Sequence, residues 1–578
     1  MPPTPTRRTF VKGLGAATAL AGLGLWRPLA QATEGRRPLH ELSGQQFELF
    51  IGQTPVNITG RPRTAQTING SLPGPQLRWR EGDTVTLRVR NRLDQPTSIH
   101  WHGIILPANM DGVPGLSFAG IEPGGDYLYQ VTLRQSGTYW YHSHSGLQEQ
   151  AGVYGAIVIE PREPEAHQYQ RDHVLLFSDW SDQAPEALMA TLKKQSDAFN
   201  YHKRTVGDFV DDVAENGWGK ALDNRWAWAK MRMSPTDLAD ISAASYTYLL
   251  NGQPPGGNFT CLFQPGETVR LRLINASAMT YFDFRIPGLK LTVIAADGLA
   301  VTPVTVDELR IAVAETYDVL VTVGDLPAYT LFAQSMDRTG FARGTLARVA
   351  GLQAPVPEPD PRPVLTMDDM GHGGMDQMDH SNMAAMDHGN MAGMDHSTMA
   401  GMAMMQSHPA SETDNPLVDM QTMAPRANLA DPGLGLRGNG RRVLTYADLR
   451  SPYPDPDGRE PSRDIQLHLT GHMERFAWSF DGIKFSDAEP LRLKYGERVR
   501  ITLVNDTMMT HPIHLHGMWS DLEDEQGRFL VRKHTIDMPP GSRRSYRVSA
   551  DALGRWAYHC HLLYHMETGM FREVRVDE

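Results

Sequence analysis

The feature that most limits the fold is a segment that occurs three times, at 81–91, 265–275 and 495–505. Each copy begins with a Gly-containing turn, continues with alternating apolar and polar residues, and ends in Asn. Alternation with a period of two is typical of a half-buried β-strand. A repeated strand-forming unit therefore predicts an all-β chain of three related domains.

Histidine pairs separated by one residue occur only in the outer two domains, at 100–102, 142–144, 514–516 and 559–561. The spacing repeats, because Asn91 and Asn505 each stand nine residues before the first histidine of a pair. In a strand, residues i and i+2 point to the same face about 7 Å apart, so each pair can bind one metal ion or two neighbouring ions. A single pair is as well explained by ordinary strand histidines, but four matched pairs predict a metal cluster where the outer domains meet.

Only the C-terminal copy carries a second group of metal ligands. When the copies are aligned, its positions hold His511, Cys560, His565 and Met570, where the N-terminal copy has Thr97, Ser143, Gln148 and Val153. Two histidines, one cysteine and a weak axial methionine are the ligands of blue-copper sites. The sequence therefore predicts one mononuclear copper site, in the last domain.

With these motifs the chain resembles the multicopper oxidases of three cupredoxin domains, and more narrowly the periplasmic copper-resistance oxidases of the CopA type. The resemblance implies three Greek-key β-sandwich or barrel domains, with a disordered Met-rich linker before the third. It also implies four copper ions as cofactors. Type 1 copper would be held by His511, Cys560, His565 and Met570, type 2 copper by His100 and His514, and the type 3 pair by His102, His142, His144, His516, His559 and His561.

The same resemblance implies a reaction. Electrons would enter one at a time at the type 1 site and pass through the peptide around Cys560 to the cluster, where dioxygen is reduced to water. The redox chemistry belongs to the metal, and the protein positions the ligands. For the protons, the resemblance points to Asp111. Many bacterial relatives have an acid directly after the third histidine of the last motif; here Met566 stands there, and Glu567 follows as the candidate relay residue.

A Met-rich stretch indicates the electron donor. Residues 367–405 contain twelve methionines, and Met-Asp-His recurs every eight residues. Thioethers favour Cu(I), and imidazole extends the preference to Cu(II). We expect this stretch to be disordered and to collect Cu(I) beside the oxidase, with a plain flexible linker as the alternative. The candidate loop ligands are Met375, Met378, His380, Met383, Met386, His388, Met391, Met394, His396 and Met399.

Composition limits the partners. The formal charge of the 578-residue chain is −12, and residues 1–32 hold four basic and no acidic residues, so their removal would leave −16. This charge argues against nucleic acid and anionic membranes and suits metal cations. The expected partners are Cu(I) and dioxygen as substrates, with periplasmic copper carriers as a further possibility.

The N-terminus has the features of an export signal. Arg7 and Arg8 begin a twin-arginine motif, which is followed by an apolar run at 13–26 and an Ala-Gln-Ala cleavage pattern. The run is shorter than the roughly 20 residues of a membrane-spanning helix. We therefore expect a signal peptide over 1–32, export to the periplasm by the twin-arginine route, and no stable membrane insertion.

Domain limits follow from the strand patterns and linker composition. We expect cupredoxin domain 1 over 40–162, domain 2 over 170–350 with an insert at about 193–240, a Pro-rich then Met/His-rich linker over 351–440, and domain 3 over 441–578. The insert has two interpretations. It is either a lid that lends Met231 and Met233 to a substrate copper ion, or a helical cover packed by its aromatic residues.

Other cysteines and histidines carry no motif. If Cys560 binds copper, Cys261 has no partner, so we expect no disulfide and a buried structural thiol. His468 and His534 are among seven histidines that we expect to be ordinary. Three functions remain open: a cuprous oxidase for copper resistance, a laccase-like phenol oxidase, and a copper-sequestering protein.

Overall fold

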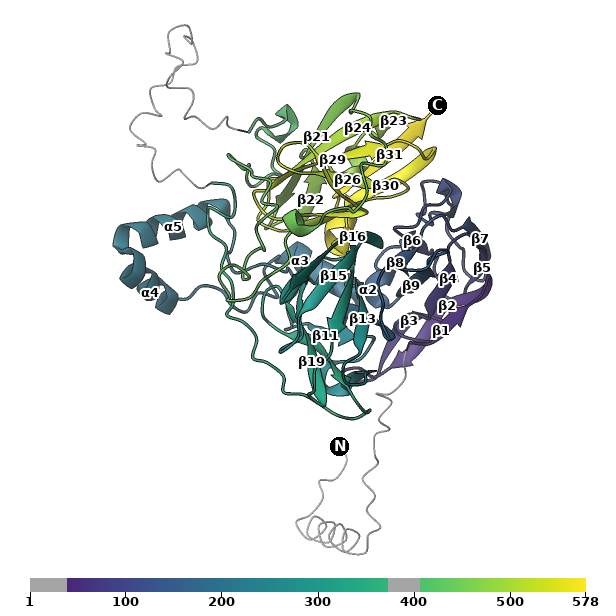
Figure 1. Cartoon of the computed structure of the whole chain (residues 1–578). Coiled ribbons are helices and arrows are strands. Elements are labelled where there is room, and N and C mark those ends of the chain that lie inside the picture. The colour runs from purple at the N-terminus through teal and green to yellow at the C-terminus, as the bar shows by residue number, and fades with distance from the viewer. Residues whose placement is uncertain (1–38, 373–405) are drawn as a thin grey trace, which may run out of the picture. The chain divides into compact units, whose positions relative to one another are not determined.

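The computed structural model describes residues 39–372 and 406–578, in which strands predominate and form six sheets (Figure 1). Residues 1–38 and 373–405 lie outside this description, and with them the predicted signal peptide and the candidate copper ligands of the Met repeats. Within the described ranges, no helix has both the length and the apolar character that crossing a membrane requires.

The first domain contains two sheets, with strand orders β1-β4-β9-β8-β6 and β3-β2-β5-β7. Its strands are β1 Glu41–Ser43, β2 Gln46–Val56, β3 Arg63–Ile68, β4 Gln76–Arg80, β5 Thr84–Asn91, β6 His100–His102, β7 Asp126–Thr132, β8 Gly137–His142 and β9 Tyr154–Glu160. Burial alternates along β5, whose apolar residues face inward, as expected for a strand in a sheet with one face toward solvent.

The second domain contains sheets of order β11-β10-β13-β18-β15-β16 and β12-β20-β19-β14-β17. Its strands are β10 Arg171–Ser181, β11 Tyr246–Leu250, β12 Phe259–Leu262, β13 Thr268–Asn275, β14 Phe282–Arg285, β15 Leu291–Ala296, β16 Leu299–Val306, β17 Glu308–Ile311, β18 Thr316–Thr322, β19 Ala328–Ser335 and β20 Phe341–Ala347. Cys261 lies in β12, is buried, and forms no disulfide, as expected.

The third domain repeats this plan strand for strand, with sheets of order β22-β21-β24-β29-β26-β27 and β23-β31-β30-β25-β28. Its strands are β21 Arg463–His472, β22 Ala477–Phe480, β23 Leu491–Lys494, β24 Arg498–Asn505, β25 His511–Leu515, β26 Ser520–Glu523, β27 Phe529–Lys533, β28 Thr535–Met538, β29 Arg543–Ser549, β30 Gly554–Cys560 and β31 Phe571–Asp577. The segment that is repeated in the sequence therefore belongs to a repeated domain with the same strand order.

The three repeated segments become three equivalent strands, β5, β13 and β24. Each pairs in parallel with an earlier strand of its domain (β2, β10 and β21) and antiparallel with a later strand (β7, β18 and β29). A strand with partners on both edges has every backbone donor and acceptor satisfied. The repeated sequence therefore supplies the central strand of each domain.

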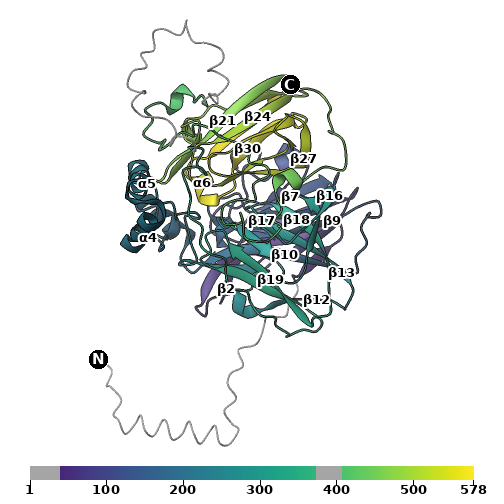
Figure 2. The same ribbon diagram turned by 60° about the vertical axis from the view of Figure 1, so that its left-hand side comes forward.

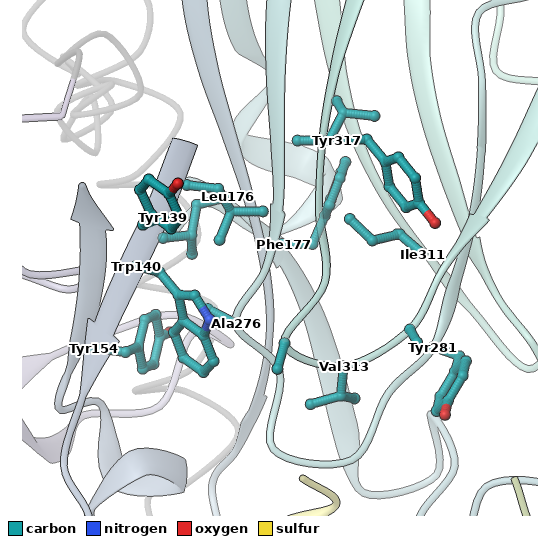
Figure 3. Packing of buried hydrophobic residues seen from close by; sticks show 14 of the residues in the cluster. Tyr139, Trp140, Tyr154, Leu176, Phe177, Ala276, Tyr281, Ile311, Val313 and Tyr317 are labelled. Atoms are coloured by element: carbon teal, nitrogen blue, oxygen red, sulfur yellow. The ribbon is translucent and has the colours of Figure 1, made fainter. Parts of the chain in front are cut away.

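One continuous apolar core runs through the three domains. Figure 3 shows part of it, with Trp140 of β8 and with Phe177 and Tyr317 of β10 and β18. Polar contacts also cross between domains: Thr138 Oγ1 donates to Asp318 Oδ1 at 2.7 Å. The described domains are thus packed against one another, which is what a site shared between the first and third requires.

Helices are few in the described residues. They are α2 Gln148–Ala151, α3 Pro185–Lys194, α4 Val206–Asn216, α5 Trp218–Met231 and α6 Leu563–Glu567. Both views show α4 and α5 beyond the sheets at the edge of the molecule (Figures 1 and 2). Trp228 is buried, but Trp218 and Trp226 are 66% and 61% exposed, so only one of the three packs as a helical cover would require. Met231 and Met233 pack against the core.

Residues 406–440, which the sequence places in the linker, contribute to the core. Met420, Leu429 and Leu436 are buried, and the Met420 segment lies beside strand β21, where Asp419 N donates to Gly471 O at 2.9 Å. The domain limits themselves stay a prediction.

Candidate metal centre

Two strand pairs carry the histidine motifs, and they have the same register. β6 pairs antiparallel with β8, so that His100 lies opposite His142. β25 pairs antiparallel with β30, so that His514 lies opposite His559. Equivalent strand pairs in the first and third domains therefore present equivalent histidines.

The repeated asparagines explain the nine-residue spacing. Asn91 Nδ2 donates to Ile121 O at 2.7 Å, and Asn505 Nδ2 donates to Met538 O at 2.8 Å. Each amide ties the end of the central strand to the neighbouring chain, because buried backbone carbonyls need a donor. The amide thereby fixes the start of the loop that follows, and this loop leads to the first histidine of the pair.

The histidines from the two domains meet. His144 Nε2 and His516 Nε2 lie 3.3 and 3.0 Å from His559 Nε2. One residue of this trio comes from the first domain and two come from the third. Three imidazole nitrogens converging at such distances form a ligand set for a transition-metal ion.

A second trio lies beside the first. His142 Nε2 lies 3.3 Å from His561 Nε2, and the ring centroids of His102 and His561 are 5.0 Å apart. The remaining pair, His100 and His514, have ring centroids 5.8 Å apart and face the same cluster. The six histidines predicted for the type 3 pair thus lie in two groups of three, with His100 and His514 beside them.

The hydrogen bonds of the pair test whether a metal fits. His100 Nδ1 donates to Asp111 O at 2.8 Å, and His514 Nδ1 donates to His534 O at 2.6 Å. A neutral imidazole that donates from Nδ1 presents a lone pair at Nε2, and metal-binding histidines are oriented in this way. Both Nε2 atoms are buried and have no hydrogen-bond partner among the described residues. The residues present therefore fit a metal ion.

The protonation of the cluster agrees with that fit. Burial, followed by the neighbouring imidazoles, holds the pKa of His514 and of His516 well below 6.5. Both side chains are therefore neutral at neutral pH, which is the form that binds a metal.

Asp111 borders the histidine cluster and contacts one candidate type 2 ligand and one candidate type 3 ligand. Its Oδ2 accepts from His516 Nδ1 at 2.8 Å, and its Oδ1 lies 3.3 Å from His100 Nδ1. The carboxylate is almost fully buried. It therefore orients two candidate ligands, which is the role of an outer-shell carboxylate.

Two residues close to the cluster were missed by the sequence reasoning. Glu149 Oε2 lies 2.7 Å from His142 Nδ1, and His534 Nδ1 lies 3.1 Å from His102 Nε2. A signal for Glu149 was present, because its place in the first copy matches that of Met566 in the last. His534 has no such signal, since its contact depends on a loop from another domain.

The second predicted group also comes together. His511 Nδ1 lies 3.4 Å and His565 Nδ1 3.9 Å from Cys560 Sγ, and the two Nδ1 atoms are 3.1 Å apart. Met570 is buried, its N donates to His565 O at 3.0 Å, and its O accepts from Cys560 N at 3.1 Å. Burial raises the pKa of the Cys560 thiol, so a bound cation is needed to stabilise its thiolate.

The outer nitrogens of these histidines are held by partners. His511 Nε2 hydrogen-bonds Thr507 Oγ1 at 2.7 Å, and His565 Nε2 hydrogen-bonds Asp240 Oδ2 at 2.8 Å. Trp478 stacks on the His565 ring with centroids 3.9 Å apart. Both Nδ1 atoms are therefore directed at Cys560. Asp240 was not found from the sequence, because it comes from the second domain.

The last candidates differ in their surroundings. Glu567 is exposed at the end of α6, and its side chain makes no hydrogen bond to the described residues. Burial of part of the side chain raises its pKa. The loop ligands between Met375 and Met399 lie outside the described residues. Their roles stay predictions.

Comparisons with known proteins agree with this geometry. Family models described as "Multicopper oxidase" match residues 51–164, 171–350 and 458–578. Copper resistance protein A of Pseudomonas syringae pv. tomato is 69% identical, over 99% of each chain. Copper resistance protein A of Escherichia coli is 65% identical, also over 99% of each chain.

Solved structures show the same fold. A multicopper oxidase from Campylobacter jejuni, described as a metallo-oxidase, superposes with a TM-score of 0.58 at 18% identity, covering 94% of this chain and 95% of that one. At this identity the likeness concerns the fold alone. The expected all-β cupredoxin-like architecture is confirmed.

Proposed function

Because the chain belongs to the multicopper oxidase family, we propose that it oxidises Cu(I) and passes the electrons to dioxygen, in the service of copper resistance. Four Cu(I) ions, one dioxygen molecule and four protons would give four Cu(II) ions and two water molecules. Bound copper supplies the one-electron chemistry, and the side chains hold the ions, admit the donor and position protons.

The proposal gives each ligand group a role. His511, Cys560 and His565, with Met570 as axial ligand, would hold the type 1 ion. The two trios described above would hold the type 3 pair, and His100 with His514 would hold the type 2 ion. This support comes from ligand type and convergence, since histidine, thiolate and thioether suit copper.

Cys560 and Asp111 connect these groups. Cys560 stands between His559 and His561, so one peptide joins the mononuclear group to both trios. Asp111 is buried against His100 and His516, where it can hold or hand on a proton. Glu567 remains a proposed relay residue at the exposed end of α6.

The observation that supports Cu(I) as the electron donor is a carboxylate, that of Asp240, beside His565. Asp240 accepts from His565 Nε2, and its second oxygen is buried without a hydrogen-bond partner in the described residues. Asp240 also lines an open cavity of about 530 Å³. The cavity wall has six aspartates and three Lys or Arg residues: Asp208, Asp211, Asp212, Asp237, Asp240, Asp337, Lys203, Arg204 and Arg362.

That excess of negative charge favours a cation over a neutral phenol. Carboxylate-lined clefts concentrate cations through their field, with low-dielectric walls strengthening the effect. A cation bound at Asp240 would be one hydrogen bond away from His565, which is itself at Cys560. Electron entry at this point needs no movement of the buried cluster.

Oxygen uptake by the copper-loaded protein tests the proposal. Wild type and a variant lacking residues 373–405 are each given Cu(I) or a simple phenol. This deletion retains Met370, which is buried in the core. Cu(I)-driven uptake that the deletion weakens supports a cuprous oxidase with a copper-collecting loop. Uptake with phenol alone, or uptake raised by the deletion, would identify a laccase-like enzyme.

A Cys560→Ser variant separates an oxidase from a storage protein. The substitution removes the thiolate and leaves the repeats intact, so copper tolerance falls if turnover provides it and persists if sequestration does. Export by the twin-arginine route is part of the same proposal. Replacement of Arg7 and Arg8 by lysine should keep the protein out of the periplasmic fraction.

A further inference from the structure

A second group of metal-ligand side chains lies in the third domain, apart from the copper ligands. His468 Nδ1 lies 2.6 Å from Asp506 Oδ2 and 3.7 Å from Glu412 Oε1. His408 Nδ1 lies 3.2 Å from both Asp506 Oδ2 and Glu412 Oε2. Two imidazoles and two carboxylates from three segments (408–412, strand β21 and the residue after β24) therefore converge on one point.

The charge at this point is not balanced by protein cations. The side chains of Asp506 and Glu412 are both fully buried. In residues 39–372 and 406–578, no Lys or Arg lies within salt-bridge distance of either carboxylate, and only histidines do. Buried carboxylates are costly unless they are paired or coordinate a metal. A divalent cation would cancel the two negative charges.

The surrounding hydrogen bonds leave the potential metal-binding atoms of this group facing one another. His408 Nε2 donates to Thr422 O at 3.0 Å, so Nδ1 faces the two carboxylates and can bind a metal ion in place of a proton. Asp506 Oδ1 accepts from Thr422 N at 2.7 Å, which leaves Oδ2 for the centre. Glu412 Oε1 is buried and has no hydrogen-bond partner among residues 39–372 and 406–578. Imidazole nitrogens and carboxylate oxygens that face one another are bridged by a proton or by a metal cation.

His468 can supply its own nitrogen to the same centre. Its Nε2 lies 2.8 Å from Gln466 Nε2, and the oxygen and nitrogen of a side-chain amide can exchange places. With the amide turned so that its oxygen faces the ring, Nε2–H donates and Nδ1 is free to bind a metal.

We propose that His408, Glu412, His468 and Asp506 form a mononuclear site for a divalent transition-metal ion. Two imidazole nitrogens and two carboxylate oxygens suit Cu²⁺ and Zn²⁺, and Cu²⁺ binds such a set more tightly. Binding here does not depend on the proposed oxidase function. The assignment of Cu²⁺ as the ion met in the cell does rest on it, since Cu²⁺ is the product of that reaction.

The site stands where the chain enters and leaves the Met repeats. Ala424 N donates to Gly371 O at 3.0 Å, and Gln406 N donates to Met423 O at 3.1 Å. The two described ends of that segment are thus bonded to the irregular segment that carries Thr422, a neighbour of both His408 and Asp506. A metal ion bound here would link the ends to β21 and to the end of β24.

Equilibrium dialysis of the full-length, copper-loaded enzyme against Cu²⁺, and separately against Zn²⁺, tests the site. The variants are His408→Ala, at its half-buried edge, and Glu412→Gln, which keeps the side-chain shape. His173→Ala is the matched control, because His173 bonds only a carbonyl, Leu262 O. All four proteins retain the Met repeats, so ions bound there cancel in the comparison.

We expect both site variants to bind one metal equivalent fewer per chain than wild type, and His173→Ala to bind the same number. The Cu²⁺ signal lost in His408→Ala should show coupling to two imidazole nitrogens by electron paramagnetic resonance. Equal stoichiometry in all four proteins would overturn the site and show an ordinary charge network. Cu(I)-driven oxygen uptake is a separate readout, so failure of the oxidase proposal is distinguishable from failure of this one.

Discussion

The contact between Asp240 and His565 makes a sharp prediction about the type 1 potential. Asp240→Asn keeps the shape and an acceptor oxygen at 2.8 Å from His565 Nε2 but removes the negative charge. Hydrogen bonds to charged groups contribute about 1.5–3 kcal/mol and neutral ones about 0.5–1.5 kcal/mol. The charged bond stabilises the oxidised, more positive site by the difference, about 1.4 kcal/mol, which corresponds to about 59 mV for one electron.

We therefore expect the type 1 potential of Asp240→Asn to lie about 60 mV above that of wild type. A redox titration of the thiolate–copper absorption measures it. Burial raises the pKa of Asp240 to about 7, so the comparison belongs at a pH above that value, where wild type carries the charge. Asp337→Asn is the control, because Asp337 lines the same cavity and is bonded instead to Ser335 and Thr339.

Donor rates give a second, independent check. A higher potential favours removal of an electron from a phenol, whereas loss of the carboxylate weakens attraction of a cation. Cu(I)-driven uptake should fall in Asp240→Asn while phenol-driven uptake rises. A potential that stays at the wild-type value or falls would refute the electrostatic reasoning. Two rates that move together would refute Asp240 as the point of cation entry.

Three further substitutions test the protein framework. Asp111→Asn should weaken retention of cluster copper by about 10–100-fold against a chelator, as expected for loss of an outer-shell carboxylate, and unchanged retention would contradict its role. Lys533→Met leaves Asp297 and Glu315 buried without their cation, and urea denaturation should show a loss of about 3–5 kcal/mol. Burial alone would raise the pKa of Asp283, but Arg310 and Arg338 lower it below 3.8. Its stabilising contribution is therefore present above pH 3.8 and lost as the pH falls through the folded value, so Asp283→Asn should differ from wild type in melting temperature near neutral pH and approach it in acid.

The convergence of the candidate ligands was predictable because the sequence signal for it is local. A His-X-His pair fixes two side chains on one face of a strand, and the duplication shows that the pairs belong together. Both facts are visible in the order of residues. The same holds for the group around Cys560, because Cys560, His565 and Met570 lie within eleven residues of sequence and His511 begins the neighbouring strand β25.

The partners of those ligands were not predictable in the same way. Asp240 reaches His565 from the second domain, across 325 residues of sequence, and His534 reaches His102 across 432. Such contacts depend on how domains pack, which no residue spacing records. His468 was expected to be ordinary for the same reason, since its neighbours Glu412 and Asp506 come from different segments.

The backbone hydrogen bonds around the candidate type 1 ligands recur in the first domain, which lacks those ligands. Val153 N donates to Gln148 O at 3.0 Å, as Met570 N does to His565 O in the third domain. Ser143 N donates to Val153 O at 2.9 Å, as Cys560 N does to Met570 O. Gln148 Oε1 accepts from Thr97 Oγ1 at 2.6 Å and from Ser143 Oγ at 3.0 Å.

The duplicated scaffold thus brings the same positions together twice, and the side chains decide what the point can hold. In the first domain, hydroxyl donors and an amide acceptor satisfy one another, so no cation is needed there. In the third, two Nδ1 atoms and a thiol sulfur face one another, and this set of soft and imidazole donors suits a metal cation. Under the proposed function, electrons would therefore enter from the third-domain side of the histidine cluster, and the acidic cavity at Asp240 lies beside the ligand group on that side.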